Sequence, residues 1–324
     1  MTKIIGIGNA LVDILVHLDD EKLLQELNLP KGGMTHVSGK ELIRLRQLLA
    51  GLPMERATGG SAANTIHALS VLGDATGFIG AVGDDEMGRF FAKQAQSRGI
   101  ETHLAVIADK QTGTANALVT PDHERTFATH LGAAPQLGQA LKDVDLTRYD
   151  ILHIEGYLLQ DQLQLKEILQ AAKAAGLLVS YDLASWNIVL DHHDYIVDLI
   201  RNYVDIAFAN EEEAAAFSGQ HDPEASLRLL ASMTKIAVVK VGKDGALGMS
   251  SATGDEICHV RGLIKPVVDT TAAGDFFAAG FLHGFVHDND LTTCLDFGNR
   301  TAGEVIQVFG TQVEPERLRQ CLNN

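Results

Sequence analysis

Short apolar runs alternate with longer segments of helical periodicity along most of this 324-residue chain. Each run has the length and β-branched content of a buried strand, and the segments between them repeat apolar residues at spacings of three and four. Strands and helices in this order favour right-handed crossovers and a mostly parallel sheet covered on both faces, so the predicted fold class is α/β. The predicted strands cover 3–8, 76–82, 149–154, 177–182, 204–209 and 236–241, and the predicted helices 39–49, 61–72, 86–98, 162–175, 211–217 and 225–233.

Two excursions interrupt this alternation, at about 11–38 and 103–130. They contain short strand-like runs at 11–18, 33–38, 104–107, 113–120 and 125–129, separated by turn signals such as Pro121-Asp122. We expect these runs to pair as a small separate sheet that forms a lid over a ligand site. The chain otherwise lacks repeats and linkers, so 1–324 is predicted to be a single domain with the lid inside it.

The composition excludes several classes of protein. The chain has 26 Lys and Arg against 42 Asp and Glu, a net charge of −16, which argues against nucleic acid as a partner. The apolar runs are too short for a membrane helix, and the N-terminus has no signal-peptide pattern, so we expect a cytoplasmic protein without membrane contact. The 3 cysteines form no C-x-x-C pair and indicate neither a disulfide framework nor a zinc site.

The most informative segment, residues 268–281, reads VDTTAAGDFFAAGF and leads from a small polar turn into an apolar helix. The N–H groups of Ala272, Ala273, Gly274 and Asp275 are expected to be free at the helix start and to point at an anion. The helix dipole is expected to keep Asp275 ionised, so that it can accept a proton from a hydroxyl nucleophile. The alternative is that Asp275 only stabilises the first turn and the small residues only pack closely.

A second glycine-rich segment, residues 57–65, reads ATGGSAANT and also opens an amphipathic helix. Gly59 and Gly60 allow close approach of the backbone and positive φ angles. Asn64, one turn into the helix, offers both a donor and an acceptor to a ligand with several hydroxyl groups. A plain helix start is the alternative, but two such segments in this order are far more specific than either alone.

With these two segments, the chain resembles the ribokinase-like carbohydrate kinases, the PfkB group, over nearly its whole length. The resemblance implies a three-layer sandwich with a mostly parallel central sheet and a small β-sheet lid. It also implies ATP-dependent transfer of the γ-phosphoryl group, with Mg²⁺, to a primary hydroxyl of a sugar or nucleoside. Asp275 would be the base, and Ala272, Ala273, Gly274 and Arg125 would neutralise the transferring group. A catalytically silent nucleotide- or sugar-binding protein of the same fold is the alternative function.

The resemblance also implies which residues bind the acceptor. The segment from Gly8 to Asp13 is similar to the first strand and turn of the family, whose Asn and Asp bind sugar hydroxyls. Tyr157 is a candidate for stacking on a purine. The expected acceptor-binding residues are Asn9, Asp13, Gly59, Gly60, Asn64 and Tyr157.

For the nucleotide, Asn210 to Glu213 resembles the N-x-x-E motif that organises Mg²⁺ and phosphates through water. An N-cap Asn with a capping-box Glu is the alternative. The segment from Lys240 to Gly245 resembles the strand and turn over the nucleotide, and a plain hairpin turn is its alternative. The expected nucleotide-binding residues are Asn210, Glu213, Lys240, Gly242, Asp244, Gly245 and Asn299, the last by family position alone.

The identity of the acceptor stays open. Residues 18–37, Gln111 to Thr114 and the Glu124-Arg125-Thr126 segment resemble adenosine kinases, by which Arg125 would swing toward the phosphates; an exposed hairpin charge is the alternative. Thr271-Ala272-Ala273 instead resembles the ribokinase version of the motif. Asp269 and Thr271 are similar to residues near a monovalent cation in ribokinases, which implies K⁺ as a further cofactor. Both a monomer and a homodimer are compatible with the sequence.

Overall fold

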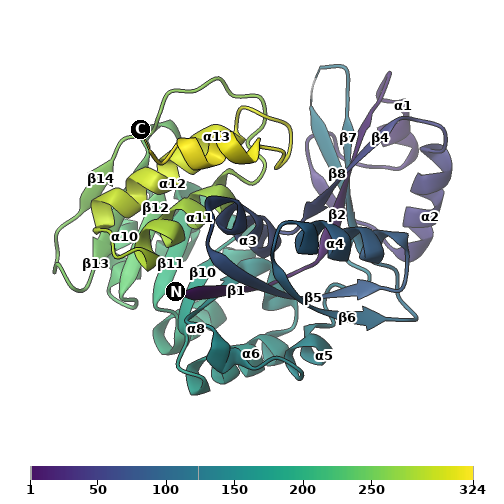
Figure 1. Ribbon diagram of the computed structural model, residues 1–324. Coiled ribbons are helices and arrows are strands. Elements are labelled where there is room, and N and C mark those ends of the chain that lie inside the picture. The colour runs from purple at the N-terminus through teal and green to yellow at the C-terminus, as the bar shows by residue number, and fades with distance from the viewer. Residues whose placement is uncertain (1, 123, 324) are drawn as a thin grey trace.

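The computed structural model describes residues 2–122 and 124–323 and is dominated by a nine-stranded sheet (Figure 1). The strand order is β14-β13-β12-β11-β10-β9-β1-β5-β6. Every pair from β6 to β12 is parallel, and β12–β13 and β13–β14 are antiparallel. The strands are β1 (Lys3–Ile7), β5 (Ala75–Gly83), β6 (Glu101–Ile107), β9 (Ile151–Glu155), β10 (Leu178–Asp182), β11 (Ile206–Asn210), β12 (Ile236–Lys240), β13 (Ala246–Ser250) and β14 (Cys258–Val260).

Helices cover both faces of this sheet. Successive residues of a strand point to opposite faces, and Ile4 of β1 accordingly packs in one apolar core while Ile5 and Ile7 pack in the other. The first core includes α3 (Ser61–Leu72), α4 (Glu86–Ser97), α11 (Ala273–Val286), α12 (Leu291–Val305) and α13 (Pro315–Gln320). The second includes α5 (Leu137–Leu141), α6 (Gln162–Ala174), α7 (Trp186–Asp191), α8 (His193–Tyr203), α9 (Glu211–Ser218) and α10 (Pro223–Ala231). The predicted three-layer α/β sandwich is confirmed.

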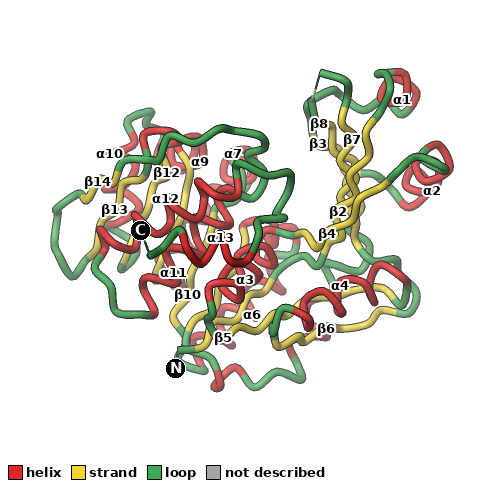
Figure 2. The backbone as a smooth tube through the Cα atoms, turned by 45° about the horizontal axis from the view of Figure 1, so that its top comes forward, coloured by secondary structure: helices red, strands yellow, loops and turns green. Residues whose placement is uncertain are grey.

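A five-stranded sheet projects from one end of the sandwich (Figure 2). Its order is β3-β8-β7-β2-β4, with β2 (Leu11–His17), β3 (Met34–His36), β4 (Met54–Gly59), β7 (Gly113–Val119) and β8 (Arg125–His130). The helices α1 (Lys22–Glu26) and α2 (Gly39–Leu48) lie on its outer side. On that side the even-numbered residues Val12, Ile14 and Val16 are buried in one cluster with Leu42 and Leu45.

The prediction that residues 104–107 form a strand of the lid is wrong. These residues belong to β6, which pairs in parallel with β5 at the edge of the large sheet. A strand that follows a helix in a β–α–β order completes a right-handed crossover, and α4 lies between β5 and β6. The small sheet instead contains β4, which the sequence did not predict because Met54-Glu55-Arg56 is exposed and has no apolar alternation.

Candidate active site

A cavity of about 680 Å³ lies where the large sheet meets the small one. The parallel strands β9, β10, β11 and β12 end at Glu155, Asp182, Asn210 and Lys240, and all four residues line it. The carboxyl ends of parallel strands lie at one edge of a sheet, where open α/β sheets bind ligands. Leu11, Asp13, Ala115, Phe127 and Thr129 of the small sheet form the opposite wall.

Most of the predicted site residues meet in this cavity. Four of the predicted residues are not part of its lining, namely Gly59, Arg125, Asp244 and Asp269. The lining includes Asn9, Asp13, Gly60, Asn64, Tyr157, Asn210, Glu213, Lys240, Gly242, Gly245, Thr271, Ala272, Ala273, Gly274, Asp275 and Asn299.

The start of α11 faces the cavity. Ala272 is the N-cap residue and has a left-handed conformation with φ of 61°, which is uncommon for a residue with a Cβ. One expectation is wrong here, because the Ala273 N–H is not free but donates to the Thr270 carbonyl at 3.2 Å. The tight turn around Ala272 brings these two groups together. Gly274 and Asp275 complete the first helical turn, whose N–H groups have no partner within the helix.

Asp275 is held by two side chains from the neighbouring helix α3. Ser61 Oγ donates to its Oδ1 at 2.6 Å, and Asn64 Nδ2 donates to its Oδ2 at 2.9 Å. Burial nevertheless raises the pKa of Asp275 to about 7, because the opposing effect of these hydrogen bonds is smaller. The sequence predicted that the helix dipole keeps Asp275 ionised. That prediction is wrong near neutral pH, because the effect of burial on the pKa is larger. A carboxylate that titrates near neutral pH is instead suited to accept and release a proton.

Lys240 and Asp182 form a buried pair beside the start of α11. Lys240 Nζ donates to Asp182 Oδ2 at 2.8 Å, and both side chains are largely buried. Burial by itself would lower the pKa of the Lys240 ammonium, but the charges of Asp182 and Glu213 outweigh it and raise the pKa. The Lys240 ammonium thus places a positive charge beside the start of α11. Sequence reasoning missed Asp182, although its position as the last residue of a buried strand was a usable signal.

Glu155 is a second residue that the sequence analysis missed. Its buried carboxylate accepts from the backbone N–H of Asn9 at 3.0 Å, from Asn9 Nδ2 at 2.8 Å and from the N–H of Ala62 at 2.7 Å. These bonds fix the side chain of Asn9 and tie β1 to the start of α3. Gly60 has φ of 99° and packs so closely on the Asn9 carbonyl that a Cβ would collide with it.

Arg125 does not reach into the cavity. Its guanidinium pairs with Asp269 and donates to Thr271 Oγ1 at 3.1 Å, and its side chain is 14% exposed, so the exposed-charge alternative is wrong. Asp269 also accepts from the N–H groups of Thr271 at 3.0 Å and Gly310 at 2.6 Å. Burial raises the pKa of nearby Asp13 to about 7, and the positive charge of Arg125 opposes this shift.

Asn210 and Glu213 form the capping box that the alternative interpretation predicts. Asn210 Oδ1 accepts from the N–H of Glu213, and the Glu213 carboxylate accepts from the backbone N–H and from Nδ2 of Asn210, each at 2.8 Å. Burial raises the pKa of Glu213 to about 7, against the effect of the Lys240 charge. Both residues line the cavity with Glu211 and Glu212, so capping does not remove them from reach of a ligand.

The segment after Lys240 is a tight turn between two antiparallel strands, as the hairpin alternative predicts. Gly242 and Gly245 both have positive φ and both line the cavity. Asn299 Nδ2 donates to the carbonyl groups of Val260 at 3.0 Å and Arg261 at 3.4 Å, and so holds the chain that follows β14. The Asp244 carbonyl hydrogen-bonds the ring of His259 at 2.9 Å, outside the cavity.

Comparison with known proteins agrees with this architecture. The family model described as pfkB family carbohydrate kinase matches residues 38–317. The chain belongs to this family. A probable sugar kinase from Rhizobium etli is 30% identical, with a TM-score of 0.88 over 100% of this chain and 99% of that one. An adenosine kinase from Sinorhizobium meliloti is 31% identical, with a TM-score of 0.86 over 99% and 98%. An adenosine kinase from Dictyostelium discoideum is 25% identical over 96% of each chain.

Homologues of this pfkB-family chain are sugar, nucleoside and adenosine kinases, which are phosphotransferases with an alcohol acceptor. The structural neighbours include both sugar and adenosine kinases. No helix in residues 2–122 and 124–323 combines the length and the apolar character that crossing a membrane requires.

Proposed function

We propose that the protein transfers the γ-phosphoryl group of ATP to the primary hydroxyl of a nucleoside, with adenosine as the first candidate. The observation that carries the proposal is the position of Asp275, which lies in the first turn of α11 and is bound by Ser61 and Asn64 of the glycine-rich segment. The anion-binding helix start and the acceptor-binding segment therefore meet at one carboxylate whose pKa is about 7.

Each end of the cavity has a task in this reaction. Asp275 would accept the proton of the attacking hydroxyl, and the first-turn N–H groups with Lys240 would stabilise negative charge on the transferring group. MgATP supplies the phosphoryl group, with Mg²⁺ neutralising charge on the phosphates. Asp182, Glu213 and Asn210 offer the hard oxygen donors that suit Mg²⁺, directly or through water. Arg125 would have to leave Asp269 before it could reach a phosphate.

The shape of the acceptor end supports a nucleoside over a free sugar. The wall contributed by the small sheet and the residues next to it is largely apolar: Leu11, Met34, Ala115, Phe127 and Leu131. A purine has two flat apolar faces to bury there, whereas a monosaccharide presents hydroxyl groups over its surface. His36 and Gln160 also line the cavity and can hydrogen-bond the edge of a base, while Asn9, Asp13 and Asn64 would bind the ribose.

The test is ADP release from MgATP with adenosine, other nucleosides, ribose and fructose as acceptors, with Asp275→Asn as the matched blank. We expect adenosine to exceed the free sugars in kcat/KM by at least about tenfold. Turnover with a free sugar but not with adenosine would contradict the nucleoside assignment. Absence of turnover with every acceptor, together with nucleotide binding, would favour the catalytically silent alternative.

The same assay tests whether K⁺ activates the protein. Asp269 and Thr271 are engaged by Arg125, so K⁺ activation would require the guanidinium to move away. Replacing K⁺ by Na⁺ in the buffer would then lower turnover. We place the reaction in the cytoplasm, where ATP is available.

A monomer is the better supported of the two assembly states. The face of the small sheet away from the cavity is buried in one cluster with α2, so it does not offer a free apolar surface to a second copy. Light scattering of the purified protein would measure its mass, and a dimer would contradict this inference.

A further inference from the structure

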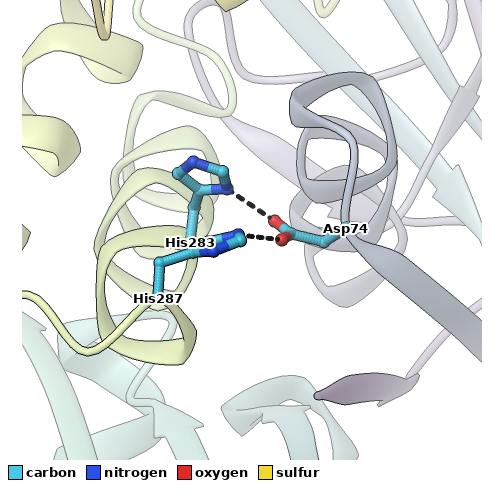
Figure 3. Close-up of side chains that lie close together, drawn as sticks. All are labelled: Asp74, His283 and His287. Carbon is cyan, nitrogen blue, oxygen red and sulfur yellow. Dashed lines mark hydrogen bonds and ion pairs between the residues drawn. The ribbon is translucent and has the colours of Figure 1, made fainter. Parts of the chain in front are cut away.

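Three potential metal ligands lie together outside the active site (Figure 3). His283 and His287 are four residues apart at the end of α11, and Asp74 lies between the end of α3 and the start of β5. His283 Nδ1 is 2.8 Å from Asp74 Oδ2, and His287 Nε2 is 3.1 Å from Asp74 Oδ1. The ligand atoms of all three residues lie within 4.8 Å of one another. Both imidazoles point at one carboxylate, which is the arrangement of a small metal site.

The carboxylate of Asp74 is almost fully buried against the two imidazoles. Its side chain is only 3% exposed, and in the described part of the chain its ion-pair partners are the two imidazoles, with no Lys or Arg among them. A cation shared by all three groups would compensate the charge of this carboxylate. Buried carboxylates without such compensation are strongly destabilising.

The donor set decides which cation fits. Two imidazole nitrogens and one carboxylate oxygen suit Zn²⁺ and neighbouring transition metals, whereas Mg²⁺ prefers oxygen ligands. Histidines four residues apart on a helix present both rings on one face, as they do in helical zinc sites. His287 is 49% exposed, so water can reach the open side and complete the coordination. We propose that Asp74, His283 and His287 form a site for a divalent transition-metal ion, with Zn²⁺ as the probe.

The position of this site suggests a structural role. α3 and α11 both begin at the active site, where Ser61 and Asn64 hold Asp275, and both end near Asp74 and the two histidines. His283 follows Asp275 by eight residues, about 12 Å along a helix axis, so the ion would not contact the reacting groups. A bound ion would tie the far ends of the two helices together, in addition to the hydrogen bonds at their near ends.

The experiment measures Zn²⁺ binding by calorimetry with full-length, metal-stripped protein that carries no polyhistidine tag. We expect one equivalent to bind and to raise the Tm, because an ion that binds the folded state stabilises it. His287→Gln, a half-exposed position that should fold normally, is expected to bind Zn²⁺ at least about tenfold more weakly and to lose the Tm increase. His221→Gln, at an exposed histidine elsewhere on the chain, is the matched control and should bind like the wild type.

Visible absorption of the Co²⁺ form gives a second measurement. We expect ligand-field bands in the wild type that are absent in His287→Gln. Failure of the wild type to bind Zn²⁺, or undiminished binding by folded His287→Gln, would overturn the proposal. In the latter case other groups, such as Cys258, Cys294 or Cys321, would hold the ion. Because these readouts do not involve phosphoryl transfer, they do not depend on the proposed function.

Discussion

The ammonium nitrogen of Lys240 lies 3.0 Å from the point that a Cβ atom on Gly274 would occupy. A lysine from the end of β12 thus reaches the first turn of α11, 34 residues further along the chain. The absence of a side chain at position 274 leaves the space between Lys240 and the helix start open to the cavity. The φ of Gly274 is not in the left-handed range, so the close approach of Lys240, and not the backbone conformation, favours glycine at this position.

Gly274→Ala is expected to lower kcat/KM by about tenfold or more, because the added methyl group displaces Lys240 and occupies the space of the transferring group. The net change in stability should be small, because the preference for alanine over glycine in a helix, about 0.5–1 kcal/mol, opposes the cost of shifting Lys240 relative to Asp182. Steady-state kinetics and thermal denaturation measure the two effects. Gly39→Ala in the first turn of α2 is the matched control, because the nearest atom to its Cβ is 3.9 Å away. Equal activity of Gly274→Ala and wild type would contradict this role.

The pH dependence of turnover follows from the pKa of Asp275. Its value of about 7 means that the carboxylate is largely protonated at pH 6 and cannot accept a proton from the acceptor hydroxyl. We expect kcat/KM to rise as the pH increases through about 7 and then to level off. Asp13, with a pKa also near 7, would contribute to the same rise in kcat/KM through its effect on acceptor binding.

Two variants separate these contributions. Asp13→Asn should keep the part of the rise in kcat/KM that Asp275 causes, whereas Asp275→Asn should lose that part and reduce kcat by about 10² to 10⁴. A kcat/KM of the wild type that does not change between pH 6 and 8 would rule out Asp275 as the titrating base.

Much of this site could be predicted because its residues lie in short contiguous motifs. Glycine-rich segments and a helix start reveal Gly60, Asn64, Gly274 and Asp275 without any knowledge of the fold. Glu155 could not be found in this way, since its role depends on contacts with Asn9 and Ala62, which are 146 and 93 residues away in the sequence. Contacts between distant segments depend on strand order, which local patterns do not specify.

Glu155→Gln tests such a contact. The amide of glutamine would place an NH₂ group opposite an N–H of Asn9 or Ala62, so at least one of the three hydrogen bonds would be lost. We expect a KM for the acceptor that is about tenfold higher, a smaller change in kcat, and a loss of stability of about 1–3 kcal/mol. Glu256→Gln, at an exposed loop position, is the control. An unchanged KM in a folded variant would show that Glu155 does not position Asn9 for the acceptor.

The ion pair between Arg125 and Asp269 makes a separate prediction. Asp269 is buried, so Arg125→Ala leaves its charge without a cationic partner and should cost about 3–5 kcal/mol of stability. The double variant Arg125→Ala/Asp269→Asn lacks that buried charge and should regain part of the stability. It should not regain activity if Arg125 acts on the phosphates. Denaturant unfolding of the wild type, both single variants and the double variant gives the coupling energy. If the stability losses of the two single variants add up to that of the double variant, Arg125 and Asp269 have no coupling energy.

The fold was predictable to a different extent in its two parts. Apart from β6, the parallel strands of the large sheet are largely buried apolar runs, and their positions were confirmed within a few residues. β4 and β6 were misjudged for opposite reasons: β4 is too exposed to show a pattern, and β6 has a pattern that fits either sheet. The helix α8 was missed although Ile196, Leu199 and Ile200 have helical spacing, because the preceding polar residues 191–194 resemble a loop.

The raised pKa of Asp275 also makes a prediction about stability. Its pKa in the folded protein, about 7, lies above the ordinary value of 3.8, so the folded state binds the proton more tightly than the unfolded state. The resulting contribution to stability is fully present below about pH 4 and is lost as the pH rises through about 7. In the Asp275→Asn variant the side chain at this position does not titrate, and all other ionisable groups are shared with the wild type. The Tm of Asp275→Asn minus that of the wild type should therefore increase between pH 5 and pH 8, whatever the constant effect of the altered hydrogen bonds to Ser61 and Asn64. A difference that stays constant or decreases over this range would show that burial does not raise this pKa, and would remove the physical basis for a base that titrates near neutral pH.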